Sequence, residues 1–121
     1  MRRILIVMLL VGLCGCGRPQ PRMAGNRWAA ALHEPDARVR RKAAFTLGNI
    51  GPSDPAVLPA LIAALRDADA GVRREAILAL LKYGPGVEEA VPALIEARDR
   101  DRDARVRADA ARALEKLNRG Q

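Results

Sequence analysis

Aromatic side chains are nearly absent from this chain of 121 residues, which has one Trp, one Tyr and one Phe. Because β-sheets favour aromatic and β-branched residues, this scarcity disfavours a sheet protein. It also removes the stacking platforms with which proteins hold single-stranded nucleic acids. Alanine, leucine, arginine and acidic residues dominate instead, and this composition favours helices with small, interdigitating side chains. The length predicts a single domain.

The sequence is also poor in the residues that catalysis and metal binding require. It has one histidine, His33, and only two cysteines, Cys14 and Cys16. No second cysteine pair or histidine cluster completes a four-ligand metal site, and no Gly-rich phosphate loop occurs. Ser53 lies in a Gly-Pro-Ser-Asp-Pro stretch typical of a turn, and nothing in the sequence brings it to His33. We therefore expect no enzymatic activity, no cofactor and no metal.

No apolar run in the sequence is long enough to cross a membrane. The longest, residues 4–13, would rise only about 15 Å as a helix, against a hydrocarbon core of about 30 Å. Two arginines precede it, and its length is that of the apolar region of a secretory signal peptide. A buried helix of the folded domain is the alternative, but the Pro-containing stretch that follows offers nothing to cover it.

Both cysteines follow this run, in the sequence Leu-Cys-Gly-Cys at residues 13–16. A redox pair needs two intervening residues, and a disulfide across a single residue would be strained. The four residues resemble the lipobox of bacterial lipoproteins, with apolar Leu13, a tolerant position, small Gly15 and the modified Cys16. An alignment on Cys14 would put the bulky Leu13 where a small residue is expected. The resemblance implies a diacylglyceryl group on Cys16 and cleavage before it.

The same resemblance sets the expected location of the protein. Two or three acyl chains give stable anchoring, since each buried methylene adds about 0.8 kcal/mol. The protein would be lipid-anchored in the bacterial cell envelope, and in the outer membrane of a Gram-negative cell because Gly17, not Asp, follows Cys16. Residues 1–15 would be the signal peptide. Residues 16–26, which contain two Pro and two Gly, would be a flexible linker.

The rest of the sequence is a threefold repeat, the strongest pattern in the chain. The segments DARVRRKAAFTLGNIG, DAGVRREAILALLKYG and DARVRADAARALEKLN begin at Asp36, Asp69 and Asp103. Val, Ala and Leu recur in them at helical spacing, and the aspartates suit helix N-caps. The segments before them align on Pro59 and Pro92, which suit the first turn of a helix. Each unit therefore predicts two helices.

These units resemble HEAT repeats, specifically the short bacterial kind related to phycobilisome-lyase HEAT-like repeats. The resemblance implies an all-α fold, a short α-solenoid of about three helix pairs. It would form a domain over residues 27–119, with repeats at about 27–51, 55–84 and 88–118. Three repeats are about the smallest stable number. The fold serves many unrelated partners, and no chromophore- or base-handling residue can be carried over from lyase or DNA glycosylase relatives.

Arginines recur at one position of every unit. In HEAT-like repeats a turn acid six residues before this arginine pairs with it across repeats, so the resemblance implies a structural ladder rather than an anion-binding stripe. The ladder comprises Arg40, Arg73 and Arg107 with Glu34, Asp67 and Asp101. Other basic residues lie beside the second helices, which line the concave binding face of HEAT solenoids. They form the candidate partner-binding surface: Arg38, Arg41, Lys42, Arg74 and Arg105.

Together these patterns favour a membrane-anchored HEAT-repeat lipoprotein, a non-catalytic scaffold that binds an unidentified protein partner in the cell envelope. The alternative is a basic module that binds polyanions or nucleic acid, because the formal net charge is +7. Export and the lack of aromatic residues argue against nucleic acid. We also expect weak self-association, since a short solenoid with a thin first repeat leaves its ends exposed.

Overall fold

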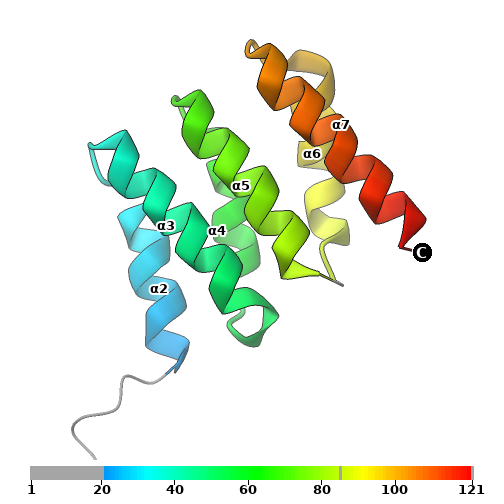
Figure 1. Cartoon of the computed structure of the whole chain (residues 1–121). Helices are drawn as coiled ribbons and strands as arrows, with labels where there is room; N and C mark the ends of the chain where they lie inside the picture. The colour runs from blue at the N-terminus through cyan, green and yellow to red at the C-terminus, as the bar shows by residue number, and fades with distance from the viewer. Residues whose placement is uncertain (1–20, 85, 121) are drawn as a thin grey trace, which may run out of the picture.

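The computed structural model describes residues 21–84 and 86–120, and all of its regular structure is helical (Figure 1). The elements are α2 (Pro21–Ala31), α3 (Ala37–Ile50), the short 3-10 turn η2 (Gly51–Ser53), α4 (Val57–Ala64), α5 (Ala70–Tyr83), the 3-10 turn η3 (Glu88–Ala90), α6 (Val91–Arg100) and α7 (Ala104–Arg119). The predicted signal peptide, Cys16 and the first residues of the predicted linker lie outside the described residues.

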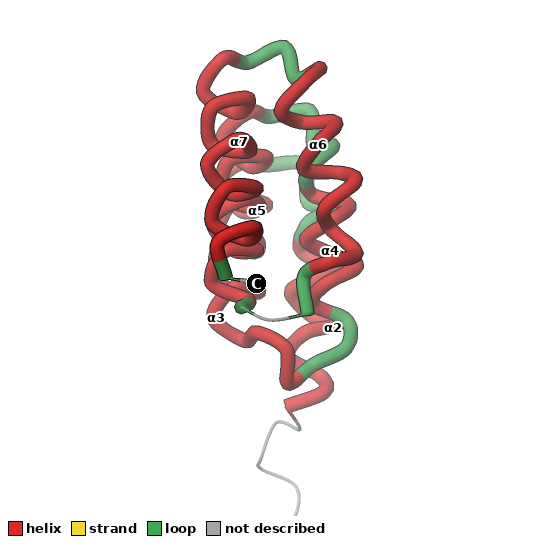
Figure 2. The backbone as a smooth tube through the Cα atoms, turned by 90° about the vertical axis from the view of Figure 1, so that its right-hand side faces the viewer, coloured by secondary structure: helices red, strands yellow, loops and turns green. Residues whose placement is uncertain are grey.

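The helices form three pairs that stack into two layers. Helices α3, α5 and α7 lie side by side in one layer, and α2, α4 and α6 form the other (Figures 1 and 2). The pairs α2–α3, α4–α5 and α6–α7 are the three predicted repeats, which confirms the short all-α solenoid. Helices α3 and α5 pack far more closely than α2 and α4 do.

A continuous apolar core fills the space between the layers. Its largest fully buried side chains include Leu47, Leu61, Leu80 and Leu94, one or more from each repeat. Buried alanines let the helices approach one another, and Trp28 of α2 packs against the N-terminal end of this core. Burying a leucine contributes about 1.5–3 kcal/mol, so the leucines recurring in the repeats are the main source of stability.

The acidic residue that begins each second helix is an N-cap, as the sequence predicts. Asp36 accepts a hydrogen bond from the backbone N–H of Arg38, and Asp69 accepts one from Val72. Asp103 accepts two, from Arg105 and Val106. These bonds satisfy N–H groups that have no partner within the helix.

Acid should weaken the cap at Asp103. The backbone N–H of Val106, which donates to the carboxylate, holds the pKa of Asp103 below its ordinary value, and Arg105 acts in the same direction. A carboxyl group whose pKa is lower in the folded state stabilises the fold above its unfolded pKa. That contribution is lost as the pH falls through the folded pKa. Asn also caps helices but does not titrate.

The Asp103→Asn variant should therefore match the wild type near pH 7 and lose stability less steeply below about pH 4. Urea unfolding at a series of pH values from about 7 down to about 2 measures the difference. Some acid sensitivity should remain, because Arg38 and Arg98 similarly lower the pKa of Asp36 and Asp99. Superimposable pH profiles for the two proteins would contradict this account.

Helix α2 begins earlier than the sequence analysis predicted. Residues 21–26 were assigned to the flexible linker, but α2 starts at Pro21. The helix is held by a distant contact, in which the backbone N–H of Gly25 donates to buried Asp54 at 3.0 Å. A Cβ atom at position 25 would lie 2.2 Å from that carboxylate, so the contact requires glycine. Composition does not indicate the first turns of α2, because their Pro and Gly residues are typical of a linker.

Gly48 allows the close approach of α3 to α5. A Cβ atom at this position would lie 2.8 Å from the Cβ of Ala79 and 2.9 Å from its Cα, which no side-chain rotation can relieve. In an exposed helix, Gly→Ala stabilises by about 1 kcal/mol. Here the Gly48→Ala variant should instead lose about 1–3 kcal/mol, because the helices must separate.

Urea midpoints of Gly48→Ala and Gly120→Ala would test this expectation. A Cβ atom at Gly120 meets nothing closer than 3.6 Å, so this control substitution should leave stability near that of the wild type. A Gly48→Ala variant at least as stable as the wild type would show that the α3–α5 contact has room to spare.

Candidate functional site

The recurring arginines join successive repeats along the edge of the molecule where the first helix of each pair turns into the second. Arg40 donates from Nε and Nη2 to the two carboxylate oxygens of Asp67, at 2.9 and 3.2 Å. Its Nη1 donates to the carbonyl oxygens of Glu34 and Pro35, both at 2.8 Å. The hydrogen-bonded Asp67 carboxylate raises the pKa of Arg40 above its ordinary value.

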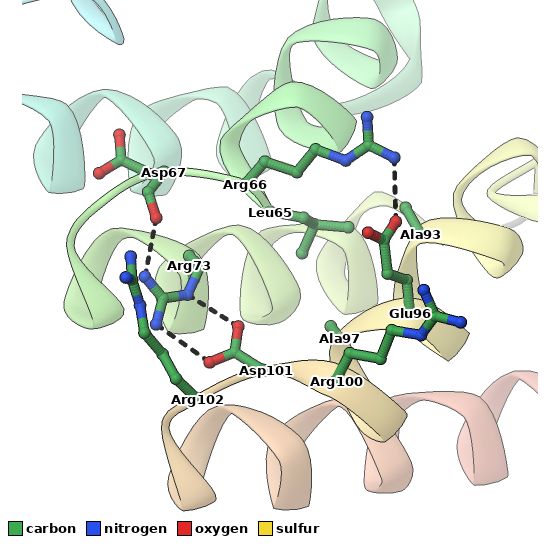
Figure 3. Close-up of a pocket in the computed structure, with 10 residues that line it drawn as sticks. All are labelled: Leu65, Arg66, Asp67, Arg73, Ala93, Glu96, Ala97, Arg100, Asp101 and Arg102. Atoms are coloured by element: carbon green, nitrogen blue, oxygen red, sulfur yellow. Dashed lines mark hydrogen bonds and ion pairs between the residues drawn. The ribbon is translucent and has the colours of Figure 1, made fainter.

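Arg73 repeats this arrangement one unit later. It binds both oxygens of Asp101 at 2.8 and 3.0 Å, and its Nη1 donates to the carbonyls of Asp67 and Ala68 (Figure 3). Both side chains of the pair are buried, at 5% and 8% exposed. Arg107 makes the same type of backbone bond, to the carbonyl of Asp101 at 2.6 Å. These bonds occupy the donors of Arg40 and Arg73, which therefore hold repeats together.

A groove of about 290 Å³ lies beside this pair, between α4 and α6 (Figure 3). Most of its charged groups are bonded to one another. Arg66 pairs with Glu96 at 2.9 Å across the groove, and Arg102 reaches the carbonyl of Ala68 at 3.4 Å. A larger groove of about 520 Å³ lies between α2 and α4, and half of the residues that line it are alanines. Neither groove brings together a catalytic arrangement of side chains.

A second set of ion pairs crosses the surface of α3, α5 and α7. Arg41 lies 3.6 Å from Glu75, and Arg74 lies 2.7 Å from Asp109. Arg112 also binds Asp109, at 2.7 Å. The hydrogen bond to Asp109 raises the pKa of Arg74 above its ordinary value.

Arg41 and Arg74, which the sequence predicts only as partner-binding residues, therefore also have a structural role. The sequence contains a sign of these ion pairs, because each arginine precedes its acid by 34 or 35 residues, about one repeat. Lys42 stands where later repeats have the acid, and Ala108 stands where earlier repeats have the arginine. Each exception falls at an end of the solenoid.

We call the exposed surface of α3, α5 and α7 the front face. It carries all five predicted surface residues, which lie at outward-facing helical positions on these three helices. Arg38 pairs with Asp36 in its own turn at 3.1 Å. Lys42 and Arg105 are exposed, and neither forms an ion pair within the described part of the chain.

Two large apolar side chains on the front face were not singled out from the sequence. Phe45 of α3 and Leu78 of α5 occupy equivalent repeat positions and are 46% and 45% exposed. The ammonium group of Lys82 lies 4.4 Å from the centre of the Phe45 ring, a cation–π contact. In the sequence both residues continue helical apolar patterns, so they resemble core residues.

The net exposed charge around these apolar residues is positive. The two acids, Glu75 and Asp109, lie beneath their arginines, with side chains only 14% and 10% exposed. The cations are more open, with Arg41 64% exposed and Arg112 69% exposed. The front face thus has an apolar centre within a basic surround.

Residues 21–84 and 86–120 contain no helix long and apolar enough to cross a membrane. Nor do they contain a group of three or more His, Cys, Asp or Glu side chains suited to a metal ion. His33 is exposed, and the Ser53 hydroxyl donates to the carbonyl of Ile50. The structure does not bring these two together with an acid.

The sequence model of the HEAT-repeat family matches residues 26–115, which span all three helix pairs. No curated protein matches the chain.

Proposed function

Because this chain belongs to the HEAT-repeat family, whose repeats generally mediate protein–protein interaction, we propose that it is a lipid-anchored, non-catalytic scaffold of the bacterial cell envelope. The partner would dock on the front face. The single observation that carries the docking site is the exposed pair Phe45 and Leu78 within a basic surround.

An apolar centre with a polar rim is the usual anatomy of a protein interface. Aromatic side chains are common anchors of binding energy, and surrounding polar contacts exclude water from them. The basic rim here complements a partner with acidic residues around an apolar anchor. Nucleic acid fits this surface less well, because Arg41 and Arg74 are already paired with buried acids. Phosphate binding depends on cations available to displace counterions.

Site-specific photo-crosslinking in cells would test the docking site. A photoreactive residue in place of Leu78 should yield covalent adducts with another protein. The same residue in place of Ala63, which is exposed on α4 in the other layer, is the matched control and should not. Adducts removed by nuclease rather than by protease would favour the nucleic-acid alternative. Equal adducts from both positions would contradict a specific front-face site.

The anchor is supported by the order of segments in the sequence: a basic start, an apolar run of signal-peptide length, and a lipobox ending at Cys16. Only residues 17–20 separate Cys16 from the start of α2 at Pro21. Five residue steps reach at most about 18 Å when fully extended. A lipid on Cys16 would therefore keep the solenoid close to the bilayer.

The mass of the mature protein decides whether the anchor exists. After expression of the full chain in a bacterial host, the wild type should be membrane-bound, begin at Cys16 and carry diacylglyceryl mass. The Cys16→Ala variant should lack the lipid and the cleavage. Cys14→Ala is the matched control and should keep both, because Cys14 leaves with the signal peptide. An uncleaved, unlipidated wild-type chain would overturn the anchor and return nucleic acid to consideration.

A further inference from the structure

Arg107 is held in the same way as the arginines of the first two repeats but lacks their acidic partner. Its Nη1 is bonded to the Asp101 carbonyl, just as Nη1 of Arg73 is bonded to the Asp67 carbonyl. In Arg40 and Arg73 this anchoring leaves Nε and Nη2 to bind a carboxylate of the following repeat. In the described part of the chain, Arg107 has this backbone bond but no carboxylate partner. The last repeat therefore presents a preformed carboxylate-binding edge.

Glu34 is the corresponding acid at the opposite end. It stands in the first repeat at the position of Asp67 and Asp101, six residues before the ladder arginine. Its side chain is exposed and forms no ion pair within residues 21–84 and 86–120. The two ends of the solenoid thus carry the two halves of one ladder contact.

At each end of the solenoid, an apolar residue is exposed although the equivalent residue of an internal repeat is buried. Val39 is 39% exposed, although Val72 and Val106 at the equivalent positions are fully buried. At the other end, Ala111 is exposed, although Ile77 at the equivalent position is fully buried. A neighbouring repeat covers each internal residue, and none covers the end residues.

The end residues of the second set of ion pairs are also compatible with a junction. In internal junctions an arginine at the Arg41 or Arg74 position faces an acid of the next repeat. A junction between two copies would set Ala108 of one against Lys42 of the other. An arginine retained at position 108 would have met that lysine, and like charges disfavour an interface. Alanine removes this conflict.

We propose that copies of this chain stack head to tail, with Arg107 of one copy binding Glu34 of the next across a junction built like those between its own repeats. Such a contact uses two different surfaces, so it extends an array rather than closing a symmetric dimer. This inference rests on the repeat geometry alone and does not depend on the lipid anchor or the front-face partner.

Charge-reversing substitutions at Glu34 and Arg107, made in two differently tagged full-length copies, would test the junction. Wild-type copies, co-expressed and extracted in mild detergent, should co-purify. Glu34→Arg paired with itself, and Arg107→Glu paired with itself, should each reduce co-purification about tenfold or more. Co-expression of a Glu34→Arg copy with an Arg107→Glu copy should recover it, since both possible junctions between these two copies join opposite charges. That recovery would also show that both variants fold.

Arg105→Glu is the matched control, because it makes the same change in net charge two residues away, on the front face. Copies carrying it should co-purify like the wild type. The proposal is overturned if wild-type copies do not co-purify, if neither single substitution has an effect, or if the exchanged pair fails to recover. Equal losses from Arg105→Glu and Arg107→Glu would likewise overturn it by attributing the effect to net charge.

Discussion

Replacing Asp101 by Ala should lower the free energy of unfolding by about 3–5 kcal/mol. The substitution leaves the guanidinium group of Arg73, only 5% exposed, without the carboxylate that binds it through two hydrogen bonds. Although a groove lies beside the pair, little of the guanidinium surface is open to water from it. The large cost comes from the uncompensated buried charge rather than from the pair's net contribution.

Comparing the urea denaturation of Asp101→Ala with that of Asp99→Ala would separate the effect of breaking a buried ion pair from the effect of removing a negative charge. Asp99 is two residues away and pairs with Arg98, but both side chains are about half exposed. Solvent compensates a broken pair at the surface, so Asp99→Ala should remain close to the wild type. If the two variants lose the same stability, the buried pair has no special role.

Replacing both members of the pair by apolar residues provides a second check. The double variant Arg73→Met with Asp101→Leu should recover most of the stability lost in Asp101→Ala, since apolar residues of similar size often replace a buried ion pair without loss. A double variant less stable than Asp101→Ala would show that the backbone bonds of Arg73 to Asp67 and Ala68 matter more than the pairing.

Replacing Leu80 by Ala should cost about 2–5 kcal/mol, because the substitution opens a cavity in the core of the central repeat. Leu80 is 1% exposed. Small domains have a total stability of only about 5–15 kcal/mol. The thermal midpoint should therefore fall by about 10 °C or more.

Leu78→Ala is the matched control for this experiment, being the same substitution two residues away on the same helix. Leu78 is 45% exposed, so its loss should change stability by no more than about 0.5 kcal/mol. Thermal unfolding followed by circular dichroism measures both variants. Similar midpoints for the two would contradict the orientation of α5. A stable Leu78→Ala variant also provides a folded protein in which to test partner binding.

The sequence was sufficient to predict the parts of the fold that depend on local pattern. Helical spacing of Val, Ala and Leu predicted the second helix of each repeat, and the aspartates marked where those helices begin. The threefold repetition then predicted the stacking, because one helix pair cannot bury both of its apolar sides.

Features that depend on contacts between repeats were harder to predict. The early start of α2 was not predicted, because the contact that holds its first turns joins Gly25 to Asp54, far along the chain. Phe45 and Leu78 follow the apolar spacing of their helices, and only the packing of α3 beside α5 shows that they face outward. The ladder illustrates both cases, since Arg40 binds Asp67 as the family resemblance implied, whereas Glu34 forms no ion pair within the described part of the chain.

The arrangement of ion pairs has a consequence for how such a chain can change in length. The central repeat carries both halves of the ladder contact and of the second set of ion pairs: Asp67 and Glu75 accept from the repeat before it, and Arg73 and Arg74 donate to the repeat after it. A tandem duplication of residues 55–87 would therefore give each of these four charges a partner of the kind it already has. Genetic gain or loss of whole middle units can lengthen or shorten the array while its end units keep their own residues.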